Sequence, residues 1–158
     1  MVVLCGIVVF ASGLIGYIIS KKLTKKATFY KNMCSFCEKL EINIAFLQNT
    51  LPEILNKIIK ENNAEIGPLV SSFKDYINNK QSSVLFPSYL KDAEKEEINN
   101  FIKAVGNGPS TLEEKLIMGF KAQMESRLKT AEYNKAKNGP LLFKLTTFIG
   151  LALAIIIY

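Results

Sequence analysis

An uncharged apolar run at the beginning of the chain constrains the fold more than any other feature. Residues 2–20 are 19 residues without a charged side chain. A helix rises about 1.5 Å per residue, so this run spans roughly 28 Å, close to the hydrocarbon thickness of a bilayer. The positive region and small-residue cleavage site of a cleaved signal peptide are not recognisable around it. We therefore expect residues 1–20 to form an uncleaved transmembrane helix.

A second apolar run lies at residues 141–158. Its charge-free part, residues 145–158, is short for a membrane span, but residues 141–143 extend it to about 27 Å. Lys144 would then lie near the membrane border, where its long side chain can reach the headgroups. We expect a second transmembrane helix here, and the alternative is a buried or interfacial C-terminal helix.

The positive charge of the chain is concentrated beside these two runs. The net charge is +6, yet residues 27–140 carry 15 basic and 14 acidic side chains and are nearly neutral. The other five basic residues are Lys21, Lys22, Lys25, Lys26 and Lys144. By the positive-inside rule these membrane-border lysines place both termini outside and the middle of the chain in the cytoplasm. A nucleic-acid-binding domain would carry its basic stripe on the folded part, so we expect no nucleic-acid partner.

The middle of the chain, residues 29–138, follows the basic juxtamembrane segment 21–28 and has helical periodicity throughout. Apolar residues recur three or four positions apart, and no segment alternates with the period of a strand. We expect helices at about 29–47, 51–61, 68–78, 92–105 and 111–137. The sequence thus predicts an all-α fold, a cytoplasmic helical bundle of about five to six helices flanked by an N-terminal and a C-terminal transmembrane helix.

Local signals mark where these helices begin and end. The patterns Thr50–Glu53 and Ser110–Glu113 are typical of capping boxes, and the pair Gly139–Pro140 predicts a break before the last apolar run. The apolar series of the expected fifth helix is spaced four residues apart and consists of Leu112, Leu116, Phe120, Met124 and Leu128.

Small residues four positions apart occur in both apolar runs. Ser12 and Gly16 form the first pair, and Gly150 and Ala154 form the second. Such spacing lets membrane helices approach closely, so these four are candidates for transmembrane packing.

The pair Cys34 and Cys37 is the sharpest chemical motif. Two more ligands would be needed for zinc, and the chain has three cysteines and no histidine. The pair lies within an expected helix with Cys37 on its apolar face, which favours packing as small hydrophobic side chains. The segment Gly106–Gly108 is a helix stop rather than a phosphate loop. Without a nucleophile–base pair we expect no enzyme, and no catalytic residue, cofactor, metal site or small-molecule substrate.

A partner-docking surface is expected where exposed apolar and turn residues occur in the middle of the chain. The candidates come from the loop near Pro87 and from the turn before the fifth helix. They are Leu85, Phe86, Gly106, Asn107, Gly108 and Ser110.

Four features in order resemble the stage III sporulation protein AB family of endospore-forming bacteria. They are the anchor ending Gly16–Leu23, the segment Leu40–Ile44 followed by Thr50–Glu53, the turn Phe101–Ser110, and the terminal apolar helix. The resemblance implies a helical domain similar to the F-type platform protein of type II secretion and type IV pilus machines. It also implies a place in the mother-cell complex that bridges the forespore envelope.

The resemblance further implies that such a protein couples a cytoplasmic secretion-type ATPase to membrane and channel-complex subunits. Membrane lipid would be a further partner, and assembly into a homo-oligomer is a further alternative. The expected location is the mother-cell membrane facing the forespore, as a two-pass protein. One alternative is a platform subunit of a type II secretion or type IV pilus-like system outside sporulation. A third hypothesis is a membrane-tethered thiol oxidoreductase that uses Cys34 and Cys37.

Overall fold

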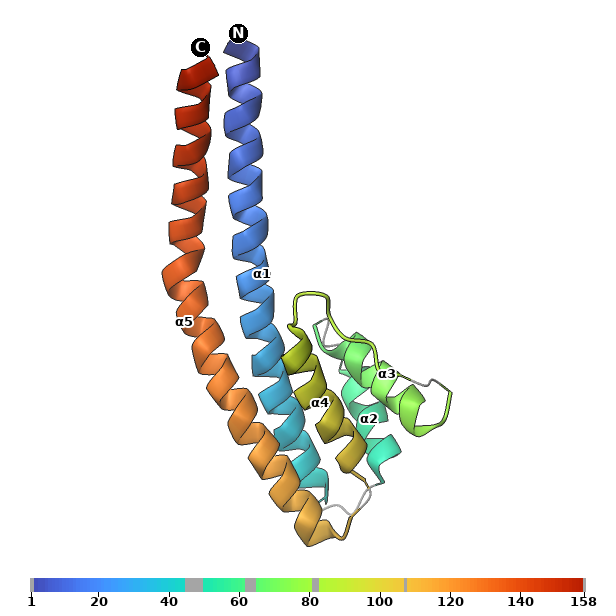
Figure 1. Ribbon diagram of the computed structural model, residues 1–158. Coiled ribbons are helices and arrows are strands. Elements are labelled where there is room, and N and C mark those ends of the chain that lie inside the picture. Colours follow the sequence, from blue (N-terminus) through green and yellow to red (C-terminus); the bar gives the residue numbers. More distant parts are fainter. Residues whose placement is uncertain (1, 45–49, 62–64, 81–82, 107, 158) are drawn as a thin grey trace. The chain divides into compact units, whose positions relative to one another are not determined.

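The computed structural model describes residues 2–44, 50–61, 65–80, 83–106 and 108–157. These residues form five helices, and no strand occurs among them, so the all-α prediction is confirmed (Figure 1). The helices are α1 (Val2–Ile42), α2 (Leu51–Lys60), α3 (Gly67–Ile77), α4 (Asp92–Ala104) and α5 (Ser110–Ile157).

The chain divides into two compact units. The first, which we call the helix pair, consists of Met1–Ala27 and Lys129–Tyr158. The second, which we call the bundle, consists of Thr28–Leu128. Both α1 and α5 contribute residues to each unit, because both helices are long: α1 has 41 residues and α5 has 48.

The expected helix break at Gly139–Pro140 is wrong, because α5 continues through Pro140. A proline inside a helix removes one backbone hydrogen bond and costs about 3 kcal/mol. Packing within the helix pair offsets that cost, since Gly139 is buried and a Cβ added there would lie 3.4 Å from Ser20 Oγ. The local sequence indicates that the proline destabilises a helix, but it does not show the packing of α5 against α1.

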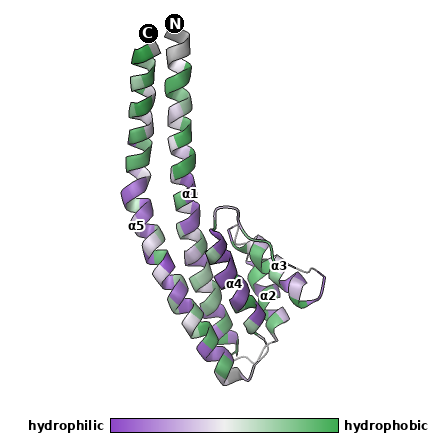
Figure 2. Ribbon diagram, viewed as in Figure 1, coloured by the Kyte–Doolittle hydropathy of each residue, from purple (hydrophilic) through white to green (hydrophobic). Residues whose placement is uncertain are grey.

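The helix pair turns its large apolar side chains outward. Phe10 is 71% exposed and Ile156 is 79% exposed, and Figure 2 shows hydrophobic colour along both members of the pair toward their termini. By length and composition, two helices among the described residues are apolar enough to cross a membrane, Gly6–Ile42 and Thr111–Ile156. Their apolar windows are only 6% and 11% buried, so these windows are not part of a buried core. Two apolar helices near the ends of the chain fit a membrane protein.

The bundle has a conventional apolar core to which all five helices contribute. Phe29 of α1 is fully buried and packs edge-to-face on Tyr30 and Tyr89, with ring centroids 5.5 and 6.2 Å apart. The other fully or nearly fully buried side chains of the bundle core include Met33, Leu40, Ile54, Leu55, Leu69, Phe73, Ile98, Ile117 and Met124. Burying a side chain of this size contributes roughly 1.5–3 kcal/mol, so the core is what holds the bundle together.

Two helices of the bundle begin with a carboxylate cap. The Thr50 N–H donates to Glu53 Oε2 at 2.9 Å, which holds the pKa of the Glu53 carboxyl below its usual value. At the start of α4 the Lys91 N–H donates to Glu94 Oε2 at 2.8 Å. The Thr50–Glu53 pattern was predicted from sequence, and the start of α2 agrees with it.

The start of α5 differs from the expected capping box at Ser110. This helix begins at Ser110 itself, with the Pro109 carbonyl accepting from the Leu112 and Glu113 N–H groups at 2.9 and 3.1 Å. The Glu113 carboxylate accepts from the Gly108 N–H at 3.2 Å. The cap therefore lies one residue earlier, because proline can close the first turn through its carbonyl.

The apolar series of α5 is only partly buried. Leu112 is 60% exposed and Leu116 is half-buried, whereas Ile117, Phe120 and Met124 are buried. Steps of four residues advance 400° around a helix of 3.6 residues per turn, a drift of about 40° per step. Five positions at this spacing cannot face one core, and the buried side follows steps of three and four residues.

Candidate docking groove

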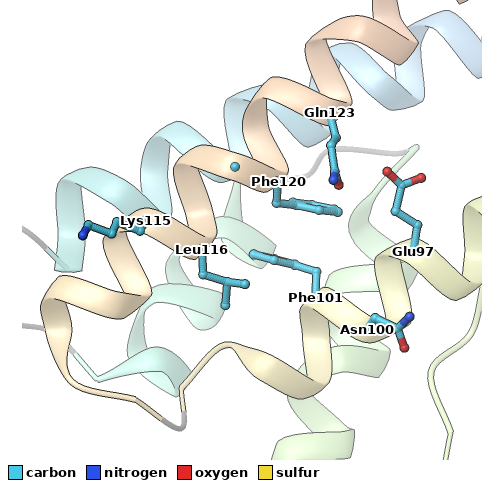
Figure 3. A pocket seen from close by; sticks show the side chains of 8 residues that line it. Glu97, Asn100, Phe101, Lys115, Leu116, Phe120 and Gln123 are labelled. Carbon is cyan, nitrogen blue, oxygen red and sulfur yellow. The ribbon is translucent and has the colours of Figure 1, made fainter.

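An open groove of about 500 Å³ lies on the bundle between α4 and α5 (Figure 3). Glu97, Asn100 and Phe101 line it from α4. Lys115, Leu116, Gly119, Phe120 and Gln123 line it from α5. The lining residues recur at three- and four-residue spacing on both helices, so the groove runs along adjacent helical faces.

The floor of the groove is apolar. The rings of Phe101 and Phe120 stack nearly parallel, with centroids 3.9 Å apart and an interplanar angle of 5°, and both residues are buried. Leu116 lies beside them (Figure 3). Gly119 adds no side chain to the wall, and a Cβ there would meet no described atom within 4 Å. The glycine therefore leaves room above the aromatic floor.

The rim of the groove is polar and carries both signs of charge. Lys115, Asn100 and Gln123 are exposed. Glu97 forms an ion pair with Arg127, whose guanidinium also lies 3.6 Å from the buried Glu94. These pairs connect α4 to α5 along one wall of the groove.

Further charged contacts hold the elements behind this wall. Burial and the neighbouring Glu94 carboxylate raise the pKa of Tyr30 above its usual value. Lys121 of α5 lies 3.5 Å from both Glu38 and Glu41 of α1. The groove is thus formed by helices that are fixed to one another by ion pairs as well as by the core.

The arrangement is suited to contact with a protein segment. An apolar centre with a polar rim is the usual anatomy of a protein interface. Among the described residues, no group of three or more Cys, Asp or Glu side chains is placed to hold a metal ion.

Cys34 and Cys37 are both buried with free thiols. Burial raises the pKa of both, that of Cys37 to about 12. Thiols with such pKa values stay protonated at neutral pH, whereas a thiolate is the nucleophile in thiol chemistry. The position of the pair in the core is consistent with their interpretation as packing residues.

The docking candidates named from sequence lie in two separate segments of the bundle. Leu85 is 61% exposed and its N–H donates to Ser72 Oγ at 2.6 Å, and Phe86 beside it is half-buried. This loop precedes α4, whereas Gly106 and Gly108 follow it, and Ser110 is the first residue of α5. The 13 residues of α4 separate the two groups by about 20 Å. Asn107 lies outside the described residues.

The small residues named from sequence lie within the helix pair, and two of them are in close contact. A Cβ added at Gly150 would lie 1.9 Å from Ser12 Oγ, and one added at Gly16 would lie 2.1 Å from Thr146 Oγ1. Gly16 is also close to backbone, since its added Cβ would be 3.1 Å from Phe143 Cα. Ala154 lies one turn beyond Gly150 and is half-buried. The contacts of Gly16 and Gly150 allow α1 and α5 to approach closely.

The border lysines all lie on the helix pair. Lys21, Lys22 and Lys25 are exposed on α1, as is Lys144 on α5, and Lys26 is partly buried. The Lys21 ammonium lies 5.8 Å from the centroid of the Tyr17 ring.

The groove itself was missed from sequence, although a signal was present. The apolar positions at the start of α5, including Leu112, Leu116, Ile117 and Phe120, cover a wider face than one core contact needs. An apolar stripe that is too wide for the core indicates a second contact surface. The positions of α1 and α4 decide which edge of this apolar face of α5 stays exposed, and the sequence of α5 alone does not give it.

The chain matches a known protein family. The family model described as stage III sporulation protein AB matches residues 1–158, the whole chain. No curated protein and no solved structure matches.

Proposed function

The chain belongs to the stage III sporulation protein AB family, and on that premise we propose that it is a membrane-anchored scaffold of the sporulation channel complex. In this role it couples a cytoplasmic secretion-type ATPase to membrane components between mother cell and forespore. One observation carries the proposal: an outward-facing apolar helix pair and a nearly neutral bundle with an open groove occur in one chain.

The helix pair is the proposed membrane anchor. Its apolar windows are long enough to cross a bilayer and leave their side chains available to lipid. The lysines lie at the ends of these apolar segments that are farther from the chain termini. By the positive-inside rule they favour a topology with the bundle in the cytoplasm of the mother cell.

The topology can be tested by labelling intact cells. Glu114 is exposed on α5 of the bundle, so a Glu114→Cys variant without the native cysteines offers one reactive thiol. We expect a membrane-impermeant maleimide to label it only after the cells are lysed. Labelling in intact cells would place the bundle on the other side of the membrane.

The groove between α4 and α5 is the proposed docking site, and its proposed occupant is a helix of the ATPase. The stacked Phe101 and Phe120 and the adjacent Leu116 provide an apolar floor for such a helix. Lys115 and Glu97 on the rim allow complementary charges on the partner to set its register.

Filling the groove without disturbing the bundle is the sharpest test. In Gly119→Leu the new side chain enters open space, and helix propensity improves, so the bundle should be slightly stabilised. We expect this variant to lose co-purification of the ATPase from sporulating cells. The matched control is Ala122→Leu, which changes an exposed α5 residue that does not line the groove. Equal recovery of the ATPase with both variants would remove the groove from the docking site.

A second pair of variants compares the exposed apolar surface next to the groove, at Leu112, with the loop before α4. Leu112 lies one turn before Leu116 and is 60% exposed, while Leu85 is 61% exposed. Changing each to aspartate introduces the same charge at the same exposure. We expect Leu112→Asp to weaken ATPase recovery and Leu85→Asp to leave it unchanged, and the opposite result would restore the loop as the docking site.

A further inference from the structure

The two units of the chain differ sharply in charge. The helix pair carries eight lysines and one acidic residue, Glu132, whereas the bundle carries 12 basic and 13 acidic residues. A net charge of +7 on the pair therefore accounts for more than the whole excess of the chain, which is +6.

Contacts within the helix pair place many of these lysines at one level. Gly150 faces Ser12, Gly16 faces Thr146, and Gly139 faces Ser20. The numbers of facing residues rise on one helix as they fall on the other, so the two helices are antiparallel. This register places residues 21–25 of α1 opposite residues 135–140 of α5.

Five exposed lysines consequently form one belt on the pair: Lys21, Lys22, Lys25, Lys135 and Lys137. Figure 2 shows this level as hydrophilic colour on both helices, directly beside their hydrophobic segments. Lys144 lies farther into the apolar segment of α5.

Two tyrosines lie beside the belt. The Lys137 ammonium donates to the Tyr133 hydroxyl at 3.0 Å and lies 5.3 Å from the centroid of its ring. Lys21 lies over Tyr17 in the same manner at 5.8 Å. Tyrosine side chains are enriched at the level of lipid headgroups, because one end is apolar and the other is polar.

We propose that this lysine belt binds the phosphate groups of anionic phospholipids in preference to zwitterionic lipids. Lipid is the occupant that the position favours, because the belt directly borders the segments whose apolar side chains face outward. Each lysine near an anionic surface strengthens binding by about fivefold. This inference rests on the proposed membrane insertion and adds a lipid preference to it.

The test uses the full chain reconstituted into vesicles of phosphatidylcholine that contain traces of spin-labelled phosphatidylglycerol or spin-labelled phosphatidylcholine. The motionally restricted fraction of each label gives its relative affinity for the protein surface. Resistance of the protein to carbonate extraction is measured on the same vesicles.

We expect the wild type to restrict phosphatidylglycerol several times more strongly than phosphatidylcholine, and salt to reduce the difference. The triple variant Lys21→Gln, Lys22→Gln and Lys25→Gln should insert equally well and lose most of the preference. The control variant Lys57→Gln, Lys60→Gln and Lys80→Gln removes the same charge from the bundle and should retain the preference.

Insertion without a lipid preference in the wild type, or an undiminished preference in the belt variant, would overturn this inference alone. Extraction of the wild type by carbonate would overturn the proposed membrane anchor as well. A belt variant that keeps its lipid preference but no longer recovers the ATPase would identify the belt as a protein-binding surface, which also contradicts the inference.

Discussion

The helix pair and the bundle use the same two long helices in opposite ways. In the bundle, α1 and α5 bury large side chains such as Phe29 and Met124, and both are almost fully shielded. In the helix pair they meet through glycine, serine and threonine, and the large side chains point outward. One pair of helices thus changes from side-chain packing to close backbone approach along its length.

This difference reflects the solvent that each unit fits. In water, removing apolar surface is the main driving force, so large buried side chains stabilise the bundle. Lipid is as apolar as leucine, so helices there associate through close van der Waals contact between small residues. The composition of the contact between α1 and α5, rather than hydropathy alone, therefore distinguishes the two environments.

The largest expected effect comes from opening a cavity in the bundle. Leu55 is fully buried, so Leu55→Ala should lower the free energy of unfolding of the bundle by about 3 kcal/mol. Urea unfolding of the full chain in detergent, followed by circular dichroism, measures this loss. The exposed Leu85→Ala is the control and should change stability by less than about 0.5 kcal/mol. An equal response of both variants would mean that the bundle has no tight core.

The next effect should occur only in the helix pair. A leucine at Gly16 meets the backbone of Phe143, which cannot move aside as a side chain can, so Gly16→Leu should destabilise the pair by about 2 kcal/mol. Gly13→Leu is the control, because a Cβ at Gly13 meets no described atom within 4 Å.

The separation of the pair can be measured by spin labels placed at Phe10→Cys and Leu153→Cys in a chain without native cysteines. We expect a longer and broader distance distribution for Gly16→Leu than for Gly13→Leu. Unfolding of the bundle should be the same in both. Identical distances in the two variants would contradict close backbone approach as the basis of the pair.

A glycine in the bundle should respond for a different reason. Gly106 has a φ of +90°, a conformation that costs an L-residue about 1–2 kcal/mol, and its added Cβ would lie 2.9 Å from Leu51 Cδ2. Gly106→Ala should therefore lower bundle stability by about 1.5 kcal/mol in urea unfolding. Gly67→Ala, at the open start of α3, should be neutral or stabilising. A neutral Gly106→Ala would show that the turn does not need the left-handed conformation.

The same contrast explains how far the sequence could predict the structure. Helices α3 and α4 were expected at residues 68–78 and 92–105 and lie at Gly67–Ile77 and Asp92–Ala104. Their ends are set by local signals, namely the proline at position 68 and the glycine at position 106. Uncharged apolar runs likewise identified the outward-facing parts of the helix pair.

The predictions that were wrong or missing concern features that depend on contacts between segments distant in sequence. The continuity of α5 through Pro140 follows from its packing against α1, which outweighs the local break signal. The groove follows from which edge of the wide apolar face of α5 is covered by α1 and α4. Spacing along one helix gives the width of its apolar face, but neighbouring helices decide which part of it is buried.

The smallest expected effect is a pH dependence confined to the bundle. Burial raises the pKa of Cys37 from 9.0 to about 12, so the folded bundle keeps this thiol protonated where the unfolded chain has lost the proton. Above pH 9 the unfolded state binds fewer protons than the folded state, and stability must therefore fall as pH rises. For Cys37 alone the expected loss is about 1 kcal/mol between pH 9 and pH 10. Urea unfolding at these two pH values measures the free energy of unfolding. Between them, Cys37→Val should lose about 1 kcal/mol less than the wild type, because valine retains the apolar contact without titrating. If both proteins lose the same stability, Cys37 is not a buried thiol, and the core of the bundle is wetter than its fully shielded position implies.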